Sequence, residues 1–481
     1  MINEISIPTG STIQEALVNI NANTLGMTFV VSNDNKLIGM VTDGDIRRGL
    51  IDGSNVNDEV NSIMNTSFTS LHIKSDNVEI LKHLSERIRV IPLVGDQGEL
   101  LDYASHRKLR RVSLVSPQFD EAELSNVIQC VKTGWVSSQG KFVREFEQQF
   151  RTYCKRPVAL ATSNGTVALH LAIEALGIGE GDEVLVPDLT FAASANSVLY
   201  AGARPILVDV ERNSLMIDIE KAERAITPRT KAIMPVHLYG QIADMDKVMA
   251  FAKKHNLFVI EDCAEALGST YKGQPVGSFG DAGSFSFFGN KIITTGEGGM
   301  VVFKSEEVGE MAAVLRDHGM DKTKRYWHNH IGFNYRMTNL QGALGTAQME
   351  KLEHFVAGKR NVASYYDEAF KSVNEIETPY INPDVENCYW MYNIILSESC
   401  KVDRDEVMNK LVKTGIECRP MFYPLSDMPV YADYCTTDIT ESKIVAARGI
   451  SLPSSPTLTE PELDFVIQNV RWAVQGEEAN S

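Results

Sequence analysis

Ser284-Phe-Ser-Phe-Phe-Gly-Asn-Lys291 is an apolar, aromatic run that ends in a lysine, and Gly296-Glu-Gly-Gly299 follows it as a tight turn. Burying a lysine without a partner is costly, so most lysines lie on a solvated face. The cost becomes useful where the side chain must be a neutral amine that forms a Schiff base. The stretch therefore makes Lys291 a candidate catalytic amine, provided that other parts of a site accompany it.

Two upstream segments supply such parts. Leu257-Phe-Val-Ile-Glu-Asp262 has the pattern of a buried strand that ends in acidic residues, where parallel sheets present functional side chains. A carboxylate at Asp262 can keep the ring nitrogen of pyridoxal phosphate protonated, which makes the ring an electron sink. Ala161-Thr-Ser-Asn-Gly-Thr166 precedes a helical pattern and can offer N–H groups to a phosphate. Together with Lys291, these segments indicate a pyridoxal phosphate enzyme.

The remaining patterns alternate between strands and helices, which predicts a mostly parallel sheet covered on both faces. Helices are expected over 121–133, 143–153 and 167–176. Strands are expected over 183–187, 204–209, 231–237 and 257–262, with an edge strand of a smaller domain over 389–396.

From about Val115 to the C-terminus, the chain resembles the sugar aminotransferases of the DegT/DnrJ/EryC1/StrS family. The stretches that carry the resemblance are Gly134-Trp-Val-Ser-Ser-Gln-Gly-Lys141, Ser163-Asn-Gly-Thr-Val-Ala-Leu-His-Leu171, Glu261-Asp-Cys-Ala-Glu-Ala-Leu-Gly268, Phe285-Ser-Phe-Phe-Gly-Asn-Lys291, Lys324-Arg-Tyr-Trp-His328, Asn334-Tyr-Arg-Met-Thr-Asn339 and Arg419-Pro-Met-Phe-Tyr-Pro424. The resemblance implies an α/β, fold-type I pyridoxal phosphate aminotransferase. We expect a large cofactor-binding domain over residues 113–356 and a small C-terminal α/β domain over 357–481.

The resemblance also implies roles for matching positions. Lys291 and Asp262 would be catalytic, Phe191 would stack on the cofactor ring, and Ser286 would join the 164–166 turn around the phosphate. Asn334 would reach the cofactor of a neighbouring subunit, so a homodimer or larger assembly with shared sites is expected. The expected cofactor-binding residues are Asn164, Gly165, Thr166, Phe191, Asp262, Glu265, Ser286, Lys291 and Asn334, with the role of Glu265 left open.

Substrate contacts are expected at Trp135, Ser137, Tyr326, His328 and Arg419. The loop that holds Trp135 and Ser137 is equally well explained as a plain interhelical connection. An exposed arginine beside a proline turn explains Arg419 nearly as well. We expect no metal site, and His170 and His237 are expected to be structural because neither metal-ligand spacing nor a nucleophile accompanies them.

Residues 12–111 contain a diverged internal repeat at an offset of 63 residues, in which 28–42 matches 91–105. This region, residues 1–112, resembles a tandem CBS module. Thr42 and Asp45 match positions that hold a ribose in such modules, whereas the second copy has Ser105 and Lys108 there. At most one complete nucleotide site is therefore expected, and a dimerising prop without a ligand is the alternative. The basic run from His106 to Arg111 is expected to be the solvated face of the closing helix.

The bulk composition narrows the class of protein. A net charge of −17 and a pI near 5.1 disfavour nucleic-acid and anionic-membrane partners. No apolar run is long enough to span a bilayer, and the start lacks the features of a secretion signal. Seven cysteines without CxxC pairs are typical of reduced thiols, so a cytoplasmic protein is expected.

The expected reaction moves the amino group of L-glutamate to the C4 ketone of a nucleotide-linked 4-keto-6-deoxy sugar, with GDP-4-keto-6-deoxymannose as the expected acceptor. UDP- or dTDP-linked keto sugars are the main alternative. A sugar dehydratase is disfavoured because the dehydratase relatives carry histidine where Lys291 stands. The remaining alternative is a nucleotide sensor on an inactive aminotransferase scaffold, against which Lys291, Asp262 and Ser286 argue.

Overall fold

The computed structural model describes residues 4–23, 25–75, 77–85, 87–105, 112–380, 382–435 and 438–475. The chain divides into two compact units, one of Met1–Arg111 with Lys410–Ile416 and one of Val112–Asn409 with Glu417–Ser481. Within the described ranges, no helix combines the length and the apolar character that crossing a bilayer requires.

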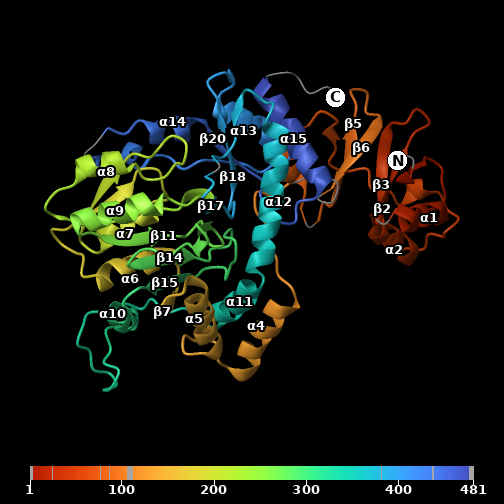
Figure 1. Cartoon of the computed structure of the whole chain (residues 1–481). Helices are drawn as coiled ribbons and strands as arrows, with labels where there is room; N and C mark the ends of the chain where they lie inside the picture. Colours follow the sequence, from red (N-terminus) through yellow and green to blue (C-terminus); the bar gives the residue numbers. More distant parts are fainter. Residues whose placement is uncertain are drawn as a thin grey trace. The chain divides into compact units, whose positions relative to one another are not determined.

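The first unit is built from two small three-stranded sheets and short helices (Figure 1). Its strands are β1 (Ser6–Pro8), β2 (Met27–Val31), β3 (Leu37–Thr42), β4 (Leu71–His72), β5 (Val90–Val94) and β6 (Leu100–Ser105). Its helices are α1 (Ile13–Asn23), α2 (Asp43–Ile51), the 3-10 turn Val60–Ser62 and α3 (Asn77–His83).

The predicted repeat is visible in the pairing of these strands. In both sheets a parallel pair (β1–β2, β4–β5) is followed by an antiparallel hairpin (β2–β3, β5–β6). The hairpin registers Met27↔Thr42 and Val90↔Ser105 differ by 63 residues on each side, the offset read from the sequence. The expected solvated helix face at 106–111 lies outside the described residues.

The second unit is organised around a seven-stranded sheet of order β7-β15-β14-β11-β10-β8-β9, in which β15 alone runs antiparallel to its neighbours. The sheet is thus mostly parallel, as predicted. Its strands are β7 (Val158–Thr162), β8 (Glu183–Pro187), β9 (Arg204–Val208), β10 (Thr230–Ile233), β11 (Phe258–Asp262), β14 (Ala282–Ser286) and β15 (Gly299–Phe303).

Both faces of this sheet are buried, because successive residues of one strand enter different apolar clusters. In β15, Met300 and Val302 belong to one cluster, and Val301 and Phe303 belong to the other. The helices of the unit are α4 (Glu121–Thr133), α5 (Lys141–Cys154), α6 (Gly165–Ala175), α7 (Ala193–Tyr200), α8 (Ile219–Ala225), α9 (Met245–His255), α10 (Glu306–Arg316), α11 (Asn339–Glu350), α12 (Leu352–Phe370), α13 (Arg404–Lys413, whose last residues fall in the other unit), α14 (Glu441–Arg448) and α15 (Glu460–Gln475).

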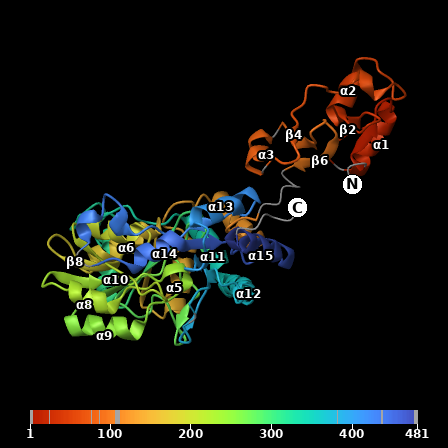
Figure 2. The same ribbon diagram turned by 90° about the horizontal axis from the view of Figure 1, so that it is seen from above.

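A smaller lobe follows α12, which Figure 1 shows as one long helix, and α15 lies beside α12 there and in Figure 2. Its sheet has the order β16-β18-β20-β19, with β16 (Ile376–Glu377), β18 (Tyr392–Leu396), β19 (Arg419–Pro420) and β20 (Gly449–Leu452). A further small sheet joins β12 (Thr270–Tyr271), β13 (Gln274–Pro275) and β17 (Val385–Glu386).

Two predicted strands differ from those observed by more than one residue. The strand expected over 389–396 is shorter and is not an edge strand, since β18 pairs with β16 on one side and β20 on the other. The strand expected over 231–237 ends at Ile233, although the chain beyond it stays beside β11 in the same register, with an isolated bridge at Val236↔Asp262.

Candidate active site

Lys291 lies in the turn after β14, where its backbone N–H donates to the carbonyl of Phe288 at 2.9 Å. Only 14% of its side chain is exposed, and its Nζ lies 3.8 Å from Oε1 of Glu265. Burial lowers the pKa of Lys291, while the negative charges of Glu265 and Asp262 oppose the change. The amine is thus held in the partly desolvated position that favours its neutral, nucleophilic form.

Asp262 ends β11 and is 5% exposed. Its Oδ2 accepts a hydrogen bond from Ser194 Oγ at 2.8 Å, and its Oδ1 accepts one from the N–H of Ala264 at 3.1 Å. Burial raises the pKa of Asp262, and the bond from Ser194 opposes the rise. A protonated ring nitrogen would supply the positive partner that keeps such a buried carboxyl ionised.

Glu265 lies in the turn after β11 and is also 5% exposed. Its Oε2 accepts the backbone N–H of Tyr239 at 2.9 Å. Burial raises the pKa of Glu265 to about 7, although the nearby Lys291 attracts the carboxylate. Glu265 is therefore a carboxyl that changes charge near neutral pH, within reach of the amine.

The turn at residues 164–166 forms the N-terminus of α6. Asn164 caps the helix by accepting the N–H of Val167 at 3.0 Å, and the first N–H groups of a helix have no partner within it. Gly165 packs so closely on β14 that an added Cβ would lie 2.8 Å from Cβ of Ser286. The structure therefore places the turn at residues 164–166 next to Ser286. This arrangement would let the N–H groups of the turn and the hydroxyl of Ser286 bind the same phosphate.

The pieces fit pyridoxal phosphate. A helix N-terminus with a neighbouring serine suits the phosphate, Asp262 suits the ring nitrogen, and Lys291 suits the aldehyde. The carboxyl ends of β11 and β14, which are adjacent parallel strands, place these groups at one edge of the sheet.

An aromatic wall borders the site, and sequence reasoning found only one of its members. Phe191 is 59% exposed and its ring lies 5.9 Å from that of Phe422. Phe422 stacks on Tyr239 at 5.5 Å, and Tyr239 stacks on Trp390 at 6.1 Å. The Lys291 Nζ lies 3.9 Å from the centre of the Trp390 ring. Tyr239, Trp390, Phe422 and the Asp262 partner Ser194 were missed, although Phe422 lies in the stretch Arg419–Pro424 that carries the family resemblance.

The other expected residues lie on the surface of the single chain. Asn334 is exposed and forms an isolated bridge with Asp317. Tyr326 is 74% exposed, and Nδ1 of the exposed His328 lies 2.9 Å from the carbonyl of His318. None of the described contacts joins these side chains to Lys291.

The loop between α4 and α5 is held by its backbone rather than its side chains. The carbonyl oxygens of Trp135 and Ser137 accept hydrogen bonds from Asn339, at 2.6 and 3.0 Å. Trp135 is 58% exposed and Ser137 is exposed. Arg419 is also exposed and lies 3.6 Å from Glu417.

The histidines take structural positions. His237 is buried, with Nε2 3.2 Å from Oε2 of Glu261, and Glu261 also accepts three backbone N–H groups, from Gly277, Phe279 and Gly280. Cys263 lies within 4.8 Å of that pair. Because Glu261 already has these donors, the group is a hydrogen-bonded support beneath Asp262. His170 is buried and its Nδ1 lies 3.0 Å from the hydroxyl of Tyr335.

In the first unit, Thr42 and Asp45 form the capping box of α2. Thr42 accepts the N–H of Asp45 at 3.2 Å, while Oδ2 of Asp45 accepts the N–H of Thr42 at 2.9 Å. Arg48 pairs with the other carboxylate oxygen at 2.5 Å. Thr42 and Asp45, the two predicted ribose contacts, thus lie side by side. In the structure they cap the N-terminus of α2. Lys108 of the second copy lies outside the described residues.

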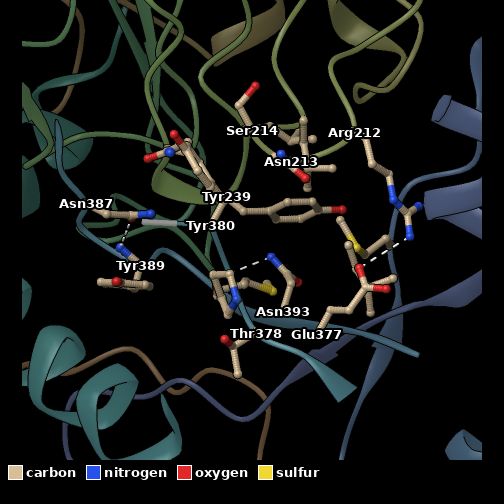
Figure 3. A pocket seen from close by; sticks show the side chains of 17 residues that line it. Arg212, Asn213, Ser214, Tyr239, Glu377, Thr378, Tyr380, Asn387, Tyr389 and Asn393 are labelled. Atoms are coloured by element: carbon tan, nitrogen blue, oxygen red, sulfur yellow. Dashed lines mark hydrogen bonds and ion pairs between the residues drawn. The ribbon is translucent and has the colours of Figure 1, made fainter. Parts of the chain in front are cut away.

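A cavity of about 250 Å³ opens beside Tyr239, between the large and small lobes of the second unit (Figure 3). Arg212 and Glu377 form an ion pair of 3.3 Å in its wall. Its lining does not include Lys291 or Asp262. The cavity therefore adjoins the candidate active site through Tyr239, whose N–H holds Glu265.

The fold and the site define a pyridoxal phosphate-dependent enzyme of the aminotransferase kind. The chain belongs to the DegT/DnrJ/EryC1/StrS aminotransferase family, whose model matches residues 117–471. A CBS domain model matches residues 1–52, the first copy of the repeat.

Among similar proteins, the GDP-perosamine synthase of Caulobacter vibrioides is 48% identical over 360 residues, which are 75% of this chain and 97% of that protein. The GDP-perosamine synthase of Escherichia coli O157:H7 is 42% identical over 363 residues, 75% of this chain and 98% of that protein.

Solved structures agree with the fold. The aminotransferase from Psychrobacter cryohalolentis has a TM-score of 0.71 and 31% identity, covering 75% of this chain and 98% of that one. A Streptococcus pneumoniae protein in its PLP-form has a TM-score of 0.72 and 27% identity, covering 76% of this chain and 99% of that one.

Proposed function

We propose that the protein transfers the amino group of L-glutamate to the C4 ketone of GDP-4-keto-6-deoxy-D-mannose, which yields GDP-perosamine. The observation that carries the proposal is the likeness to GDP-perosamine synthases, which spans nearly their whole length at 41–48% identity. The partly buried Lys291, with two acidic side chains around it, supports the transfer chemistry.

In this proposal each residue has a definite task. When bound, pyridoxal phosphate supplies an aldehyde and an electron-withdrawing ring. Lys291 would hold the aldehyde of the bound cofactor, and its Nζ, when free, would take a proton from Cα of the amino acid. Asp262 would hold the ring nitrogen, and Gly165, Thr166 and Ser286 would hold the phosphate. The fall in the pKa of Lys291 on burial supports its role as a base.

The active site is proposed to be completed by a second copy of the chain. Asn334, Tyr326 and His328 lie on one exposed segment and contact no part of their own site among the described residues. A symmetric dimer would let this segment reach a neighbouring cofactor and acceptor. Trp135, Ser137 and Arg419 stay candidate acceptor contacts on the same reasoning.

A panel of GDP-, UDP- and dTDP-linked 4-keto sugars, assayed with glutamate, tests the acceptor. We expect the GDP-linked 4-keto-6-deoxymannose to give the aminated sugar, identified by mass spectrometry, and Lys291→Ala to give none. Turnover of another nucleotide sugar with none of the GDP compound would overturn the proposal. A UDP-linked acceptor is the second candidate, since a UDP-sugar 3-aminotransferase of Acidithiobacillus ferrooxidans is 39% identical over 317 residues, 65% of this chain.

For the N-terminal region we propose a CBS pair over residues 1–112 that binds one nucleotide next to Thr42 and Asp45. The strand repeat supports the pair, and the adjacency of the two side chains supports the single site. Calorimetric titration of the full chain with ATP, AMP and GDP-sugars tests it, and absence of heat with every nucleotide would leave a ligand-free prop. The cofactor-binding and small domains, 113–356 and 357–481, complete the proposed organisation.

A further inference from the structure

Trp390 contacts the candidate catalytic lysine from two directions, although it lies in a different lobe of the unit. Its indole Nε1 donates a hydrogen bond of 2.7 Å to the carbonyl of Asn290, the residue before Lys291. The face of its ring lies 3.9 Å from Lys291 Nζ, within the range of a cation–π contact. One side chain therefore holds both the backbone of the lysine turn and the amine at the end of the lysine side chain.

The Trp390 side chain is itself fixed in place. It is 4% exposed and stacks on Tyr239, with 7° between the two rings. Its carbonyl accepts a hydrogen bond of 3.0 Å from the buried Nζ of Lys359, which also donates to the carbonyl of Ser454 at 2.7 Å. Turning the indole away from Lys291 would break the stacking and leave the Asn290 carbonyl without this donor.

The contacts around the amine close into a ring of four residues. Tyr239 donates its N–H to Glu265, the other oxygen of Glu265 lies 3.8 Å from Lys291 Nζ, and Trp390 joins Lys291 back to Tyr239. Asp262 is the second acidic group whose charge acts on the amine. Two acidic groups and one aromatic face thus stabilise the ammonium form, whereas burial favours the neutral amine.

We propose that Trp390 is a positioning residue for Lys291, which uses its ring face to hold the ammonium form and its N–H to fix the turn that carries the lysine. The inference rests on the proposed role of Lys291 as the attachment point of the cofactor. Without the indole ring of Trp390, the neutral amine of Lys291 forms at lower pH. Without the indole N–H, the turn that carries Lys291 is held less firmly, so the amine meets an aldehyde in the right geometry less often.

The test measures capture of added pyridoxal phosphate by the full chain after removal of bound cofactor, followed by absorbance across pH. Trp390→Phe keeps a ring and loses the N–H, so the limiting capture rate at high pH should fall about tenfold. Trp390→Leu also loses the ring, so the midpoint of the pH profile should move down by about one pH unit. Tyr366→Phe is the matched control, since it removes a 3.0 Å hydrogen bond from another buried ring to a backbone carbonyl, that of Pro453.

Borohydride reduction and peptide mass spectrometry then locate the captured label. Label on a residue other than Lys291 would overturn the proposed chemistry and this inference with it. Label on Lys291, with wild-type rate and midpoint in the Trp390→Phe and Trp390→Leu variants, would overturn the inference alone. If Trp390→Leu does not fold, the rate of Trp390→Phe relative to Tyr366→Phe decides, and equal rates would refute the positioning role. A purely structural role would leave the pH midpoint unchanged or move it up, because loss of the ring would let water reach the amine.

Discussion

Lys359 is a buried cation whose effect on stability should depend on pH. It is 2% exposed, its Nζ donates to the carbonyls of Trp390 and Ser454, and burial lowers its pKa from 10.5 to about 8. At 1.36 kcal/mol per pH unit, this difference corresponds to about 3 kcal/mol by which the charged side chain destabilises the fold. The penalty is nearly complete below pH 8 and disappears only above pH 10.5, so about 2 to 3 kcal/mol is relieved between pH 7 and pH 10.

The perturbation is Lys359→Met, which removes the charge. A unit of about 360 residues unfolds with an entropy of about 0.8 kcal/mol/K, so a relief of about 2 to 3 kcal/mol corresponds to about 3 °C. Scanning calorimetry at a fixed scan rate should therefore show the melting temperature of the wild type rising by about 3 °C relative to Lys359→Met between pH 7 and pH 10. At pH 7 the variant also loses two hydrogen bonds, which shifts the curves by a constant but leaves their difference in pH dependence.

Two further variants make this result decisive. Lys359→Gln keeps a donor for the carbonyls without the charge, and it should show the same relative pH dependence as Lys359→Met. Lys132→Met removes an exposed lysine on α4 and should show none. The assignment of a buried ammonium at Lys359 would be refuted if the difference in melting temperature between wild type and Lys359→Met were the same at every pH. It would also be refuted if the melting temperature of the wild type fell relative to that of the variant as the pH rises.

Three other outcomes follow from the site and the first unit. Lys291→Ala should reduce turnover by about a thousandfold or more, because the general base is lost. Pyridoxal phosphate should still bind without a covalent bond, which its absorbance spectrum and its removal on dialysis would show. Retained turnover would contradict the catalytic role of Lys291. Glu265→Gln should remove an inflection near pH 7 from the pH profile of pyridoxal phosphate capture by the cofactor-free chain, because the carboxyl, whose pKa is about 7, ionises there and the amide does not; an unchanged profile would exclude Glu265. Thr42→Ala should cost about 1 kcal/mol of stability through loss of the α2 cap, measured as a lower melting temperature of the first unit; an unchanged melting temperature would show that the cap is not needed.

The parts of the fold that were predictable are those with local patterns. The helix over 121–133 and the strand over 183–187 were predicted with the observed bounds, because a capping acid and a short apolar run mark them. The strand over 231–237 was predicted too long because the apolar pattern continues beyond Ile233, where β10 ends. The chain keeps its register beside β11 as far as the isolated bridge Val236↔Asp262, so the pattern follows the neighbouring strand further than the regular ladder does.

The candidate site divides in the same way. Lys291, Asp262 and the 164–166 turn were found because each stands at a strand or helix terminus with a recognisable composition. Trp390 was not, since its partner Asn290 is 100 residues away and the two meet only when the small lobe packs on the sheet. Sequence patterns thus identified the groups that touch the cofactor in our proposal, but not the groups that hold them.

The charges around Lys291 connect these two sets of residues. Asp262 and Glu265 both lie within the field of a single ammonium, and burial raises the pKa of each. Two ionised carboxyls beside one cation would leave a net negative charge in the protein interior. Glu265, whose pKa is about 7, is the group that can take up a proton and remove that charge. Before Lys291 bonds to the aldehyde, a pyridinium nitrogen beside Asp262 would neutralise that carboxylate and leave Glu265 and the Lys291 ammonium as a pair. Binding of pyridoxal phosphate should then favour the ionised form of Glu265, and proton release on binding, measured by calorimetry in buffers of different ionisation enthalpy, should be smaller in Glu265→Gln, in which only Lys291 can release a proton. Equal release in both proteins would assign the proton to another group.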